Sequence, residues 1–91
     1  MFFDVTAAQH LQGYRIRLEF RDGSAGIVDL AGYAAQDNVF RAFRDDDYFR
    51  GFHIELGTLV WGDGELDIAP ETLYAKATGR VVVYSQEKSR V

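Results

Sequence analysis

Residues 14–20 read Tyr14-Arg15-Ile16-Arg17-Leu18-Glu19-Phe20, with apolar side chains at the even positions and charged side chains at the odd positions. Such strict alternation is typical of a β-strand with one buried face and one exposed face. The Asp22-Gly23 pair soon after it is a strong hairpin-turn signal, so residues 25–30 are expected to return as an antiparallel partner. Residues 3–11 are expected to form the preceding strand. The sequence therefore predicts a three-stranded meander over residues 3–30.

The hydrophobic spacing becomes helical in the middle of the chain. Apolar residues recur at helical spacing over residues 39–43, after two candidate capping residues, Asp37 and Asn38. Residues 45–47 are all aspartate, and acidic side chains are unfavourable at a helix C-terminus. We therefore expect the first helix to end near Arg44, and one of the aspartates to cap a second short helical turn.

The second half of the chain predicts further strands and one more helix. Strands are expected over residues 52–56, 58–61 and 65–68. The next helix has Pro70 in its first turn, where no amide hydrogen is needed, and Gly79 as its stop. The prediction is an α+β fold in which an antiparallel sheet of five or six strands packs against one or two short helical segments. The N-terminal meander and a later hairpin supply most of that sheet.

Residues 1–79 are predicted to form this single domain, and residues 80–91 a C-terminal extension. The extension begins with the β-branched segment Arg80-Val81-Val82-Val83-Tyr84, which is expected to form an edge strand before a frayed tail. Val81, Val83 and Tyr84 are therefore candidate partner-binding residues, acting by strand addition to a protein partner or to a second copy.

Composition limits the classes of function. The chain has 91 residues and no cysteine, which excludes disulfides, thiolate zinc sites and cysteine nucleophiles. The net charge of −4 argues against non-specific nucleic-acid binding. The N-terminus lacks the regions of a signal peptide, and no apolar run could cross a bilayer, so a cytoplasmic protein without a membrane partner is expected.

Residues that could carry chemistry are sparse. His10 and His53 do not stand at metal-ligand spacing. The acidic alternation over residues 63–67 resembles the start of a calcium loop, but Ile68 stands where that loop needs glycine and Tyr74 where it needs glutamate. We therefore expect a protein that is not an enzyme, with no catalytic residue, metal site or cofactor.

Two further sets of residues are candidates for binding. Arg41, Arg44 and Arg50 cluster around the helical segment and could contact phosphate or an acidic partner, although the neighbouring aspartates favour local charge pairing. Trp61 and Tyr74 could line an aromatic pocket, although in so small a domain aromatic side chains more often form the core.

Several motifs, in this order, resemble a known bacterial family. They are Phe3-Asp4-Val5, Tyr14 to Gly23, Val39-Phe40 through Tyr48-Phe49, Gly57 to Trp61, and Leu66 to Tyr74. Over residues 2–75 the chain resembles the family catalogued as domain of unknown function two-four-four-two. Asp46 stands where members often have proline, and Gly62-Asp63 replaces a common Pro-Asn turn; both are loop changes.

The resemblance implies a bacterial, cytoplasmic α+β protein with no established activity and no assigned catalytic residues. Many members resemble one half of a two-gene pair, in the manner of toxin–antitoxin modules. We therefore expect a noncatalytic protein-interaction module, the antitoxin-like or regulatory half of such a pair, which binds a protein partner or forms a dimer. The alternatives are a nucleic-acid-associated regulator that uses the arginine cluster, disfavoured by net charge, and a small ligand-binding protein with an aromatic pocket.

Overall fold

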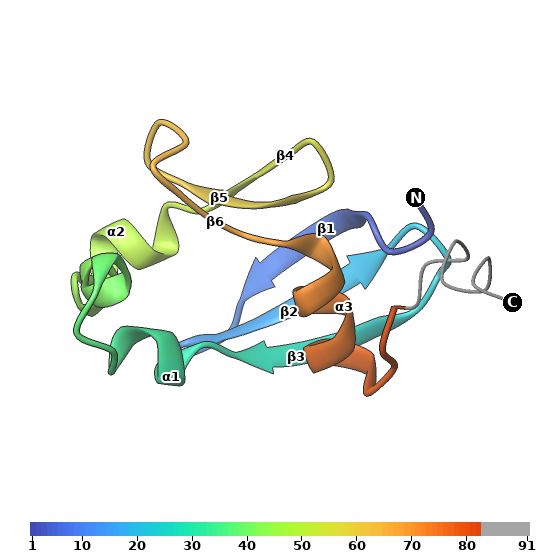
Figure 1. The fold of residues 1–91 in the computed structure, drawn as a ribbon, viewed down its shortest axis with the longest axis horizontal. Coiled ribbons are helices and arrows are strands. Elements are labelled where there is room, and N and C mark those ends of the chain that lie inside the picture. The colour runs from blue at the N-terminus through green and yellow to red at the C-terminus, as the bar shows by residue number, and fades with distance from the viewer. Residues whose placement is uncertain (83–91) are drawn as a thin grey trace, which may run out of the picture.

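The computed structural model describes residues 1–82 and has an α+β architecture (Figure 1). Its N-terminal sheet is an antiparallel meander in the order β1-β2-β3, formed by β1 (Val5–His10), β2 (Arg15–Phe20) and β3 (Ala25–Asp29). The even residues of β2 are buried and the odd ones exposed, as the alternation predicted. The predicted meander is confirmed.

A second meander follows, in the order β4-β5-β6. Its strands are β4 (His53–Glu55), β5 (Thr58–Trp61) and β6 (Leu66–Ile68), so all three strands predicted in this half are present. Every residue of the central strand β5 is buried, whereas every residue of β4 is exposed.

The prediction of a single sheet of five or six strands is wrong, because these meanders form two separate three-stranded sheets. They meet where the Val5 N–H donates to the Gly57 carbonyl at 2.8 Å. At this same point β1 has an irregularity between Val5 and Ala7. A bulge bends a strand and increases its local twist. The Val5–Gly57 hydrogen bond does not extend into a ladder that joins β1 to β4.

Four helical segments lie beside the sheets, more than the one or two predicted. They are α1 (Ala31–Ala34), the 3₁₀ helix η1 (Val39–Arg44), α2 (Asp46–Arg50) and α3 (Pro70–Thr78). The predicted end of the first helix at Arg44 is confirmed, as is the second helical turn after it. The segment α1 was not predicted, because it has four residues and no capping side chain on its N-cap residue, Leu30.

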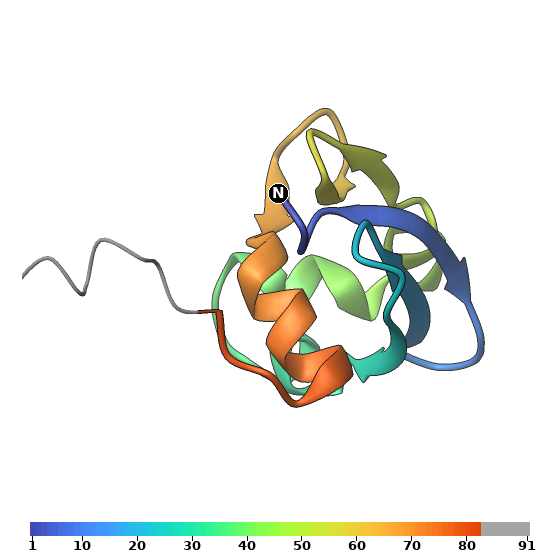
Figure 2. The same cartoon turned by 90° about the vertical axis from the view of Figure 1, so that its right-hand side faces the viewer.

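The longest helix, α3, begins at Pro70 and ends before Gly79, which has φ +79°. It packs against β3 at Gly26, where an added Cβ atom would lie 2.1 Å from the Ala77 carbonyl oxygen. Glycine is therefore required here for the helix to approach the strand. Figure 2 shows α3 and the other helices on one side of the N-terminal sheet, with the outer face of β1 and β2 uncovered by them.

The core is built largely from aromatic rings. Phe43 of η1, Phe49 of α2 and Trp61 of β5 are fully buried, and the rings of Phe43 and Trp61 have centroids 4.6 Å apart. The Trp61 Nε1–H donates to the Phe49 carbonyl at 2.8 Å, which satisfies the one polar atom of the indole. These contacts fix the helical segment against the second sheet.

The C-terminal strand predicted over residues 80–84 is not formed within this chain in the part that the structure describes. Residues 80–82 adopt no regular structure, and Val83 and Tyr84 lie outside the described residues. Among residues 1–82 there is no helix with the length and apolar character needed to traverse a lipid bilayer.

Candidate interaction surfaces

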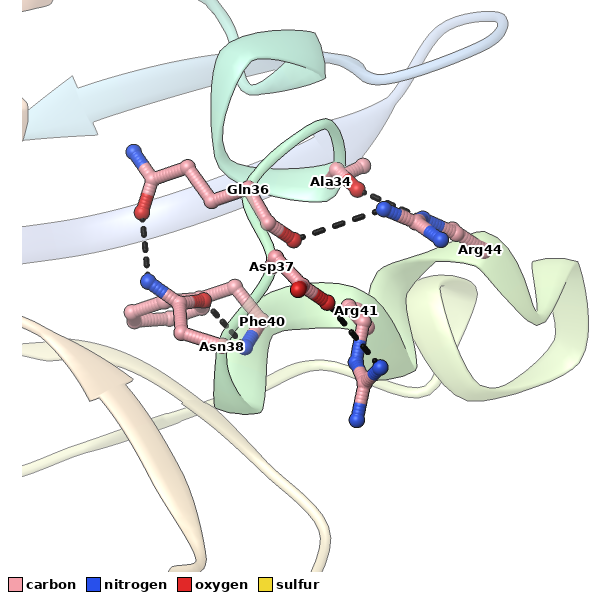
Figure 3. Close-up of polar contacts among 7 residues, drawn as sticks. All are labelled: Ala34, Gln36, Asp37, Asn38, Phe40, Arg41 and Arg44. Carbon is pink, nitrogen blue, oxygen red and sulfur yellow. Dashed lines mark hydrogen bonds and ion pairs between the residues drawn. The ribbon is translucent and has the colours of Figure 1, made fainter.

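The segment that carries the three candidate arginines is held together by side-chain caps (Figure 3). The Asn38 side-chain oxygen accepts from the Phe40 N–H at 2.9 Å, so Asn38 and not Asp37 caps η1. Asp45 caps α2 by accepting from the Tyr48 N–H at 3.2 Å, as predicted for one of the three aspartates.

Arg41 and Arg50 each form an ion pair with an aspartate four residues earlier in the chain. Arg41 Nη1 lies 3.0 Å from Asp37 Oδ1, and Arg50 Nε lies 3.2 Å from Asp46 Oδ2. All four side chains are more than half exposed, so each pair adds little to stability. The pairs nevertheless place a carboxylate against both guanidinium groups, which weakens their attraction for phosphate.

Arg44 has a different role, because its guanidinium group contacts main-chain carbonyls (Figure 3). Its Nε donates to the Ala34 carbonyl at 2.8 Å, and its Nη2 donates to the Gln36 carbonyl at 3.4 Å. Ala34 is the last residue of α1, where carbonyls lack helical partners. Arg44 therefore joins the end of α1 to η1, and the structure does not bring the three arginines together around one common site.

The two residues of the predicted aromatic pocket lie in different ring clusters. Trp61 packs among Phe43, Phe49 and Phe52, whereas Tyr74 packs edge-on against Phe2 and Phe20. Both side chains are buried, and no pocket opens in residues 1–82. The structure thus places Trp61 and Tyr74 in the core and not around a shared cavity.

Tyr74 also belongs to a polar network that the sequence did not predict. Its hydroxyl donates to Asp22 Oδ2 at 2.7 Å and accepts from Arg80 Nη1 at 3.1 Å. Hydrogen bonds from the Ser24 hydroxyl, from Tyr74 and from the Ser24 N–H hold the pKa of Asp22 down at about 2. The network ties the end of α3 to the β2–β3 turn.

The two histidines each contact a nearby residue of their own segment. His10 Nε2 lies 2.9 Å from the Gly13 carbonyl oxygen, and the exposed His53 Nε2 lies 3.7 Å from Glu55 Oε2. Over residues 1–82, no three histidine, aspartate or glutamate side chains gather closely enough to hold a metal ion.

Leu56 is the most unusual surface residue in the described chain. It forms the β4–β5 turn with Gly57, and its side chain is 98% exposed. Its φ is +51°, the only positive φ among the non-glycine residues of the described chain. A two-residue turn with both φ angles positive favours Asn-Gly, because a leucine side chain is strained there. Sequence reasoning assigned Leu56 to a strand, although the Leu-Gly pair between two strands was a usable turn signal.

Two other exposed apolar residues, Phe2 and Val81, lie on the N-terminal segment and on the chain after α3. Figure 1 shows the N-terminus at the right, the β4–β5 turn at the top and the chain after α3 at the bottom, with η1 and α2 at the left-hand end. We use the name terminal surface for these three exposed residues, Phe2, Leu56 and Val81, whose segments are connected by the contacts that follow.

A series of contacts connects the parts of the terminal surface. The Gly57 carbonyl next to Leu56 accepts from Val5 of the N-terminal segment. The Phe2 ring meets the Tyr74 ring at 5.5 Å between centroids. Arg80, which precedes Val81, donates to the Tyr74 hydroxyl. These contacts therefore connect three segments that are far apart in sequence.

The family model described as "Protein of unknown function (DUF2442)" matches residues 5–79. The chain belongs to this family, as the resemblance of its motifs indicated. Comparison with curated proteins and with solved structures finds no match.

Proposed function

We propose that this member of the DUF2442 family is a noncatalytic protein-interaction module that binds a protein partner through the terminal surface. The partner is proposed to be the other product of a two-gene pair, in which this chain is the antitoxin-like or regulatory half. The observation that carries the proposal is the exposure of Leu56 in a left-handed conformation.

Leu56 is unfavourable in the isolated chain for two independent reasons. A non-glycine residue in the left-handed region costs roughly 1–2 kcal/mol. Its side chain also buries almost no apolar surface against the rest of the protein. Burying a leucine side chain in an interface contributes about 1.5–3 kcal/mol, which would offset the strain once a partner covers the turn. Strain at a surface position is often associated with function.

Charged groups lie on or beside the segments that carry the apolar residues of the terminal surface. Arg21 Nε lies 3.5 Å from Asp4 Oδ2, beside the β4–β5 turn, and Arg80 and Asp22 lie on either side of the Tyr74 hydroxyl. An apolar centre with a polar rim is the usual composition of a protein–protein interface. Arg21 and Arg80 would orient the partner, while Leu56 and Phe2 would supply most of the buried area.

The alternative of a nucleic-acid-associated regulator is less well supported. Arg41 and Arg50 are paired with aspartates, and Arg44 donates to main-chain carbonyls. Strand addition through Val83 and Tyr84 stays a prediction, since these residues lie outside the described chain.

The test is an affinity capture from native host lysate with three versions of the tagged protein. The baits are the wild type, Leu56→Asn and Val39→Asn. Asparagine tolerates the left-handed conformation, so Leu56→Asn removes the apolar side chain without removing the turn. Val39 is an exposed apolar residue on η1, outside the terminal surface, and serves as the matched control.

We expect one stoichiometric small protein, encoded beside this gene, with the wild type and with Val39→Asn. Its recovery should fall at least tenfold with Leu56→Asn. Toxicity of that protein when expressed alone would support the antitoxin-like role. Equal recovery with all three baits would refute the terminal surface as the binding site. Recovery of nucleic acid in place of a protein would favour the regulator.

A further inference from the structure

The strand β3 lies at the free edge of the N-terminal sheet. It pairs with β2 on one side, and within the described residues no strand pairs with its other side. The Phe20 N–H donates to the Ser24 carbonyl and the Leu30 N–H to the Tyr14 carbonyl. Because bonded pairs alternate along an antiparallel ladder, residues 25, 27 and 29 direct their N–H and C=O groups away from β2. These groups form a row of main-chain donors and acceptors along the edge.

The edge of β3 has few of the features that usually block edge-to-edge pairing. Such features are bulges, prolines, very short strands and charged side chains, above all lysines, and β3 has only the charged Asp29 at its end. The register of β3 is regular over all five residues, and its sequence, Ala-Gly-Ile-Val-Asp, contains neither proline nor lysine. The opposite edge strand, β1, has both an irregularity at Val5/Ala7 and a hydrogen bond to the β4–β5 turn. Another strand can therefore pair more easily with the β3 edge than with the β1 edge of the same sheet.

Ile27, at the centre of β3, adds an apolar side chain to this edge. Its side chain is 46% exposed on the outer face of the sheet. The α3 helix packs on the opposite face, against Gly26, and so does not cover Ile27.

We propose that β3 pairs antiparallel with β3 of a second copy of this chain, which joins two three-stranded sheets into one of six strands. Centred on Ile27, this pairing sets Ile27 opposite Ile27 of the second copy, and main-chain groups of residues 25, 27 and 29 would supply up to about six hydrogen bonds.

The charge pattern of β3 selects this arrangement. In the antiparallel register, Asp29 lies opposite Ala25 of the second copy, so no like charges face each other. Parallel pairing in register would set the two Asp29 carboxylates side by side, which is destabilising. The small Ala25 side chain leaves room for the approach. The sequence of β3 is thus complementary to itself about a two-fold axis, as an isologous interface requires.

The self-association is tested by sedimentation equilibrium of the full chain over a range of concentrations. The wild type should behave as a dimer at micromolar concentration. Ile27→Lys places a charge at the centre of the interface and should raise the dissociation constant at least tenfold. Gln9→Lys is the matched control. Gln9 is exposed on β1, and both Gln9 and Ile27 lie opposite Arg17 of β2, one on each side, so the two substitutions place a lysine beside the same neighbour. This variant should still form the wild-type dimer.

A mixing experiment makes the test independent of simple misfolding. Ile27→Lys and Ile27→Glu should each be monomeric alone and should form a mixed dimer when combined, because opposite charges then face each other. A monomeric wild type at high micromolar concentration would overturn the proposal. So would an Ile27→Lys protein that remains as dimeric as the wild type. Leu56→Asn should not change the dimer, so this proposal and that of the terminal surface fail separately.

Discussion

The residues of this protein differ in how fully the fold satisfies their hydrogen bonds and buries their apolar atoms. Trp61 is fully buried and its indole N–H reaches the Phe49 carbonyl, so both its apolar and polar parts are accommodated. Asp22 accepts from Ser24 and from Tyr74, which is 52 positions away. Leu56 is the opposite case, because its backbone is strained and its side chain contacts almost nothing.

The strain at Leu56 predicts a stabilising substitution. Leu56→Asn should raise the free energy of unfolding by about 1 kcal/mol, because asparagine adopts the left-handed conformation more readily. For a domain of this size the melting temperature should rise by roughly 4–8 °C. Thermal unfolding followed by circular dichroism measures the change. Leu56→Ala keeps most of the strain and should change little; a melting temperature that falls with Leu56→Asn would contradict the prediction.

The lowered pKa of Asp22 predicts a specific pH dependence of stability. The pKa falls from an ordinary value of 3.8 to about 2 in the folded protein, so the folded state favours the carboxylate form. The contribution to stability is present above pH 4 and is lost as the pH falls from about 4 to about 2. Urea unfolding at pH 2–6 should therefore show wild type and Asp22→Asn converging at low pH. A constant difference across this range would disprove the role of the carboxylate charge.

At the scale of elements, close contacts and caps decide how short helices are held. The α3 helix contacts β3 through Gly26, and α1 is held to η1 by Arg44. The capping residues Asn38 and Asp45 define where η1 and α2 begin. Because α1, η1 and α2 have four to six residues each, they depend on such contacts more than on intrinsic helix propensity.

Gly26→Ala should weaken the packing of α3 on the N-terminal sheet. The added methyl group would overlap the Ala77 carbonyl, a main-chain atom that cannot move without moving the helix. We expect a loss of about 1–3 kcal/mol in the free energy of unfolding, measured by urea titration. Gly32→Ala, in α1, is the control, because an added Cβ there meets nothing within 4 Å and should be neutral or stabilising. Equal effects of both substitutions would argue against this contact.

Arg44→Gln should destabilise the protein more than the same change at Arg50. It removes charge-assisted hydrogen bonds to the carbonyls of Ala34 and Gln36, which are worth about 1.5–3 kcal/mol when donor or acceptor is charged. Arg50→Gln breaks only an exposed ion pair with Asp46 and should cost about 0.5 kcal/mol or less. Chemical denaturation of the two variants gives the comparison. Similar losses would mean that Arg44 does not join α1 to η1.

The strands were the most predictable part of the fold, because their signals are local. The alternation in residues 14–20 and the Asp-Gly turn determine the meander without distant contacts. The division into two sheets was not predictable, since it depends on the irregularity in β1 and on the Val5–Gly57 contact, which has no local signature. The segment α1 was missed for a related reason: a four-residue helix shows too little periodicity.

The candidate surfaces were less predictable than the fold. The arginines were correctly placed around the helical segment, but the carbonyl partners of Arg44 are set by tertiary structure. The exposure of Leu56 could not be read from composition, because an apolar residue next to a strand normally enters the sheet. Phe2, Leu56 and Val81 lie on three segments that are distant in sequence, and only contacts of the folded chain connect those segments.

At the scale of the whole molecule, the structure offers two separate surfaces. The terminal surface is proposed to bind a different protein, whereas the edge of β3 is proposed to bind a second copy. The two surfaces use different chemistry, since the first is strained and apolar and the second consists mainly of main-chain donors and acceptors. A protein that uses both would present two terminal surfaces per dimer, so partner binding would occur with a ratio of two to two.

The most direct test of the proposed function is calorimetric titration of the captured partner, once purified, into wild type, Leu56→Asn and Val39→Asn. We predict an equal dissociation constant for wild type and Val39→Asn, and one at least tenfold higher for Leu56→Asn, which corresponds to about 1.4 kcal/mol of lost binding free energy. Equal dissociation constants for all three proteins would contradict the proposal that the partner covers Leu56.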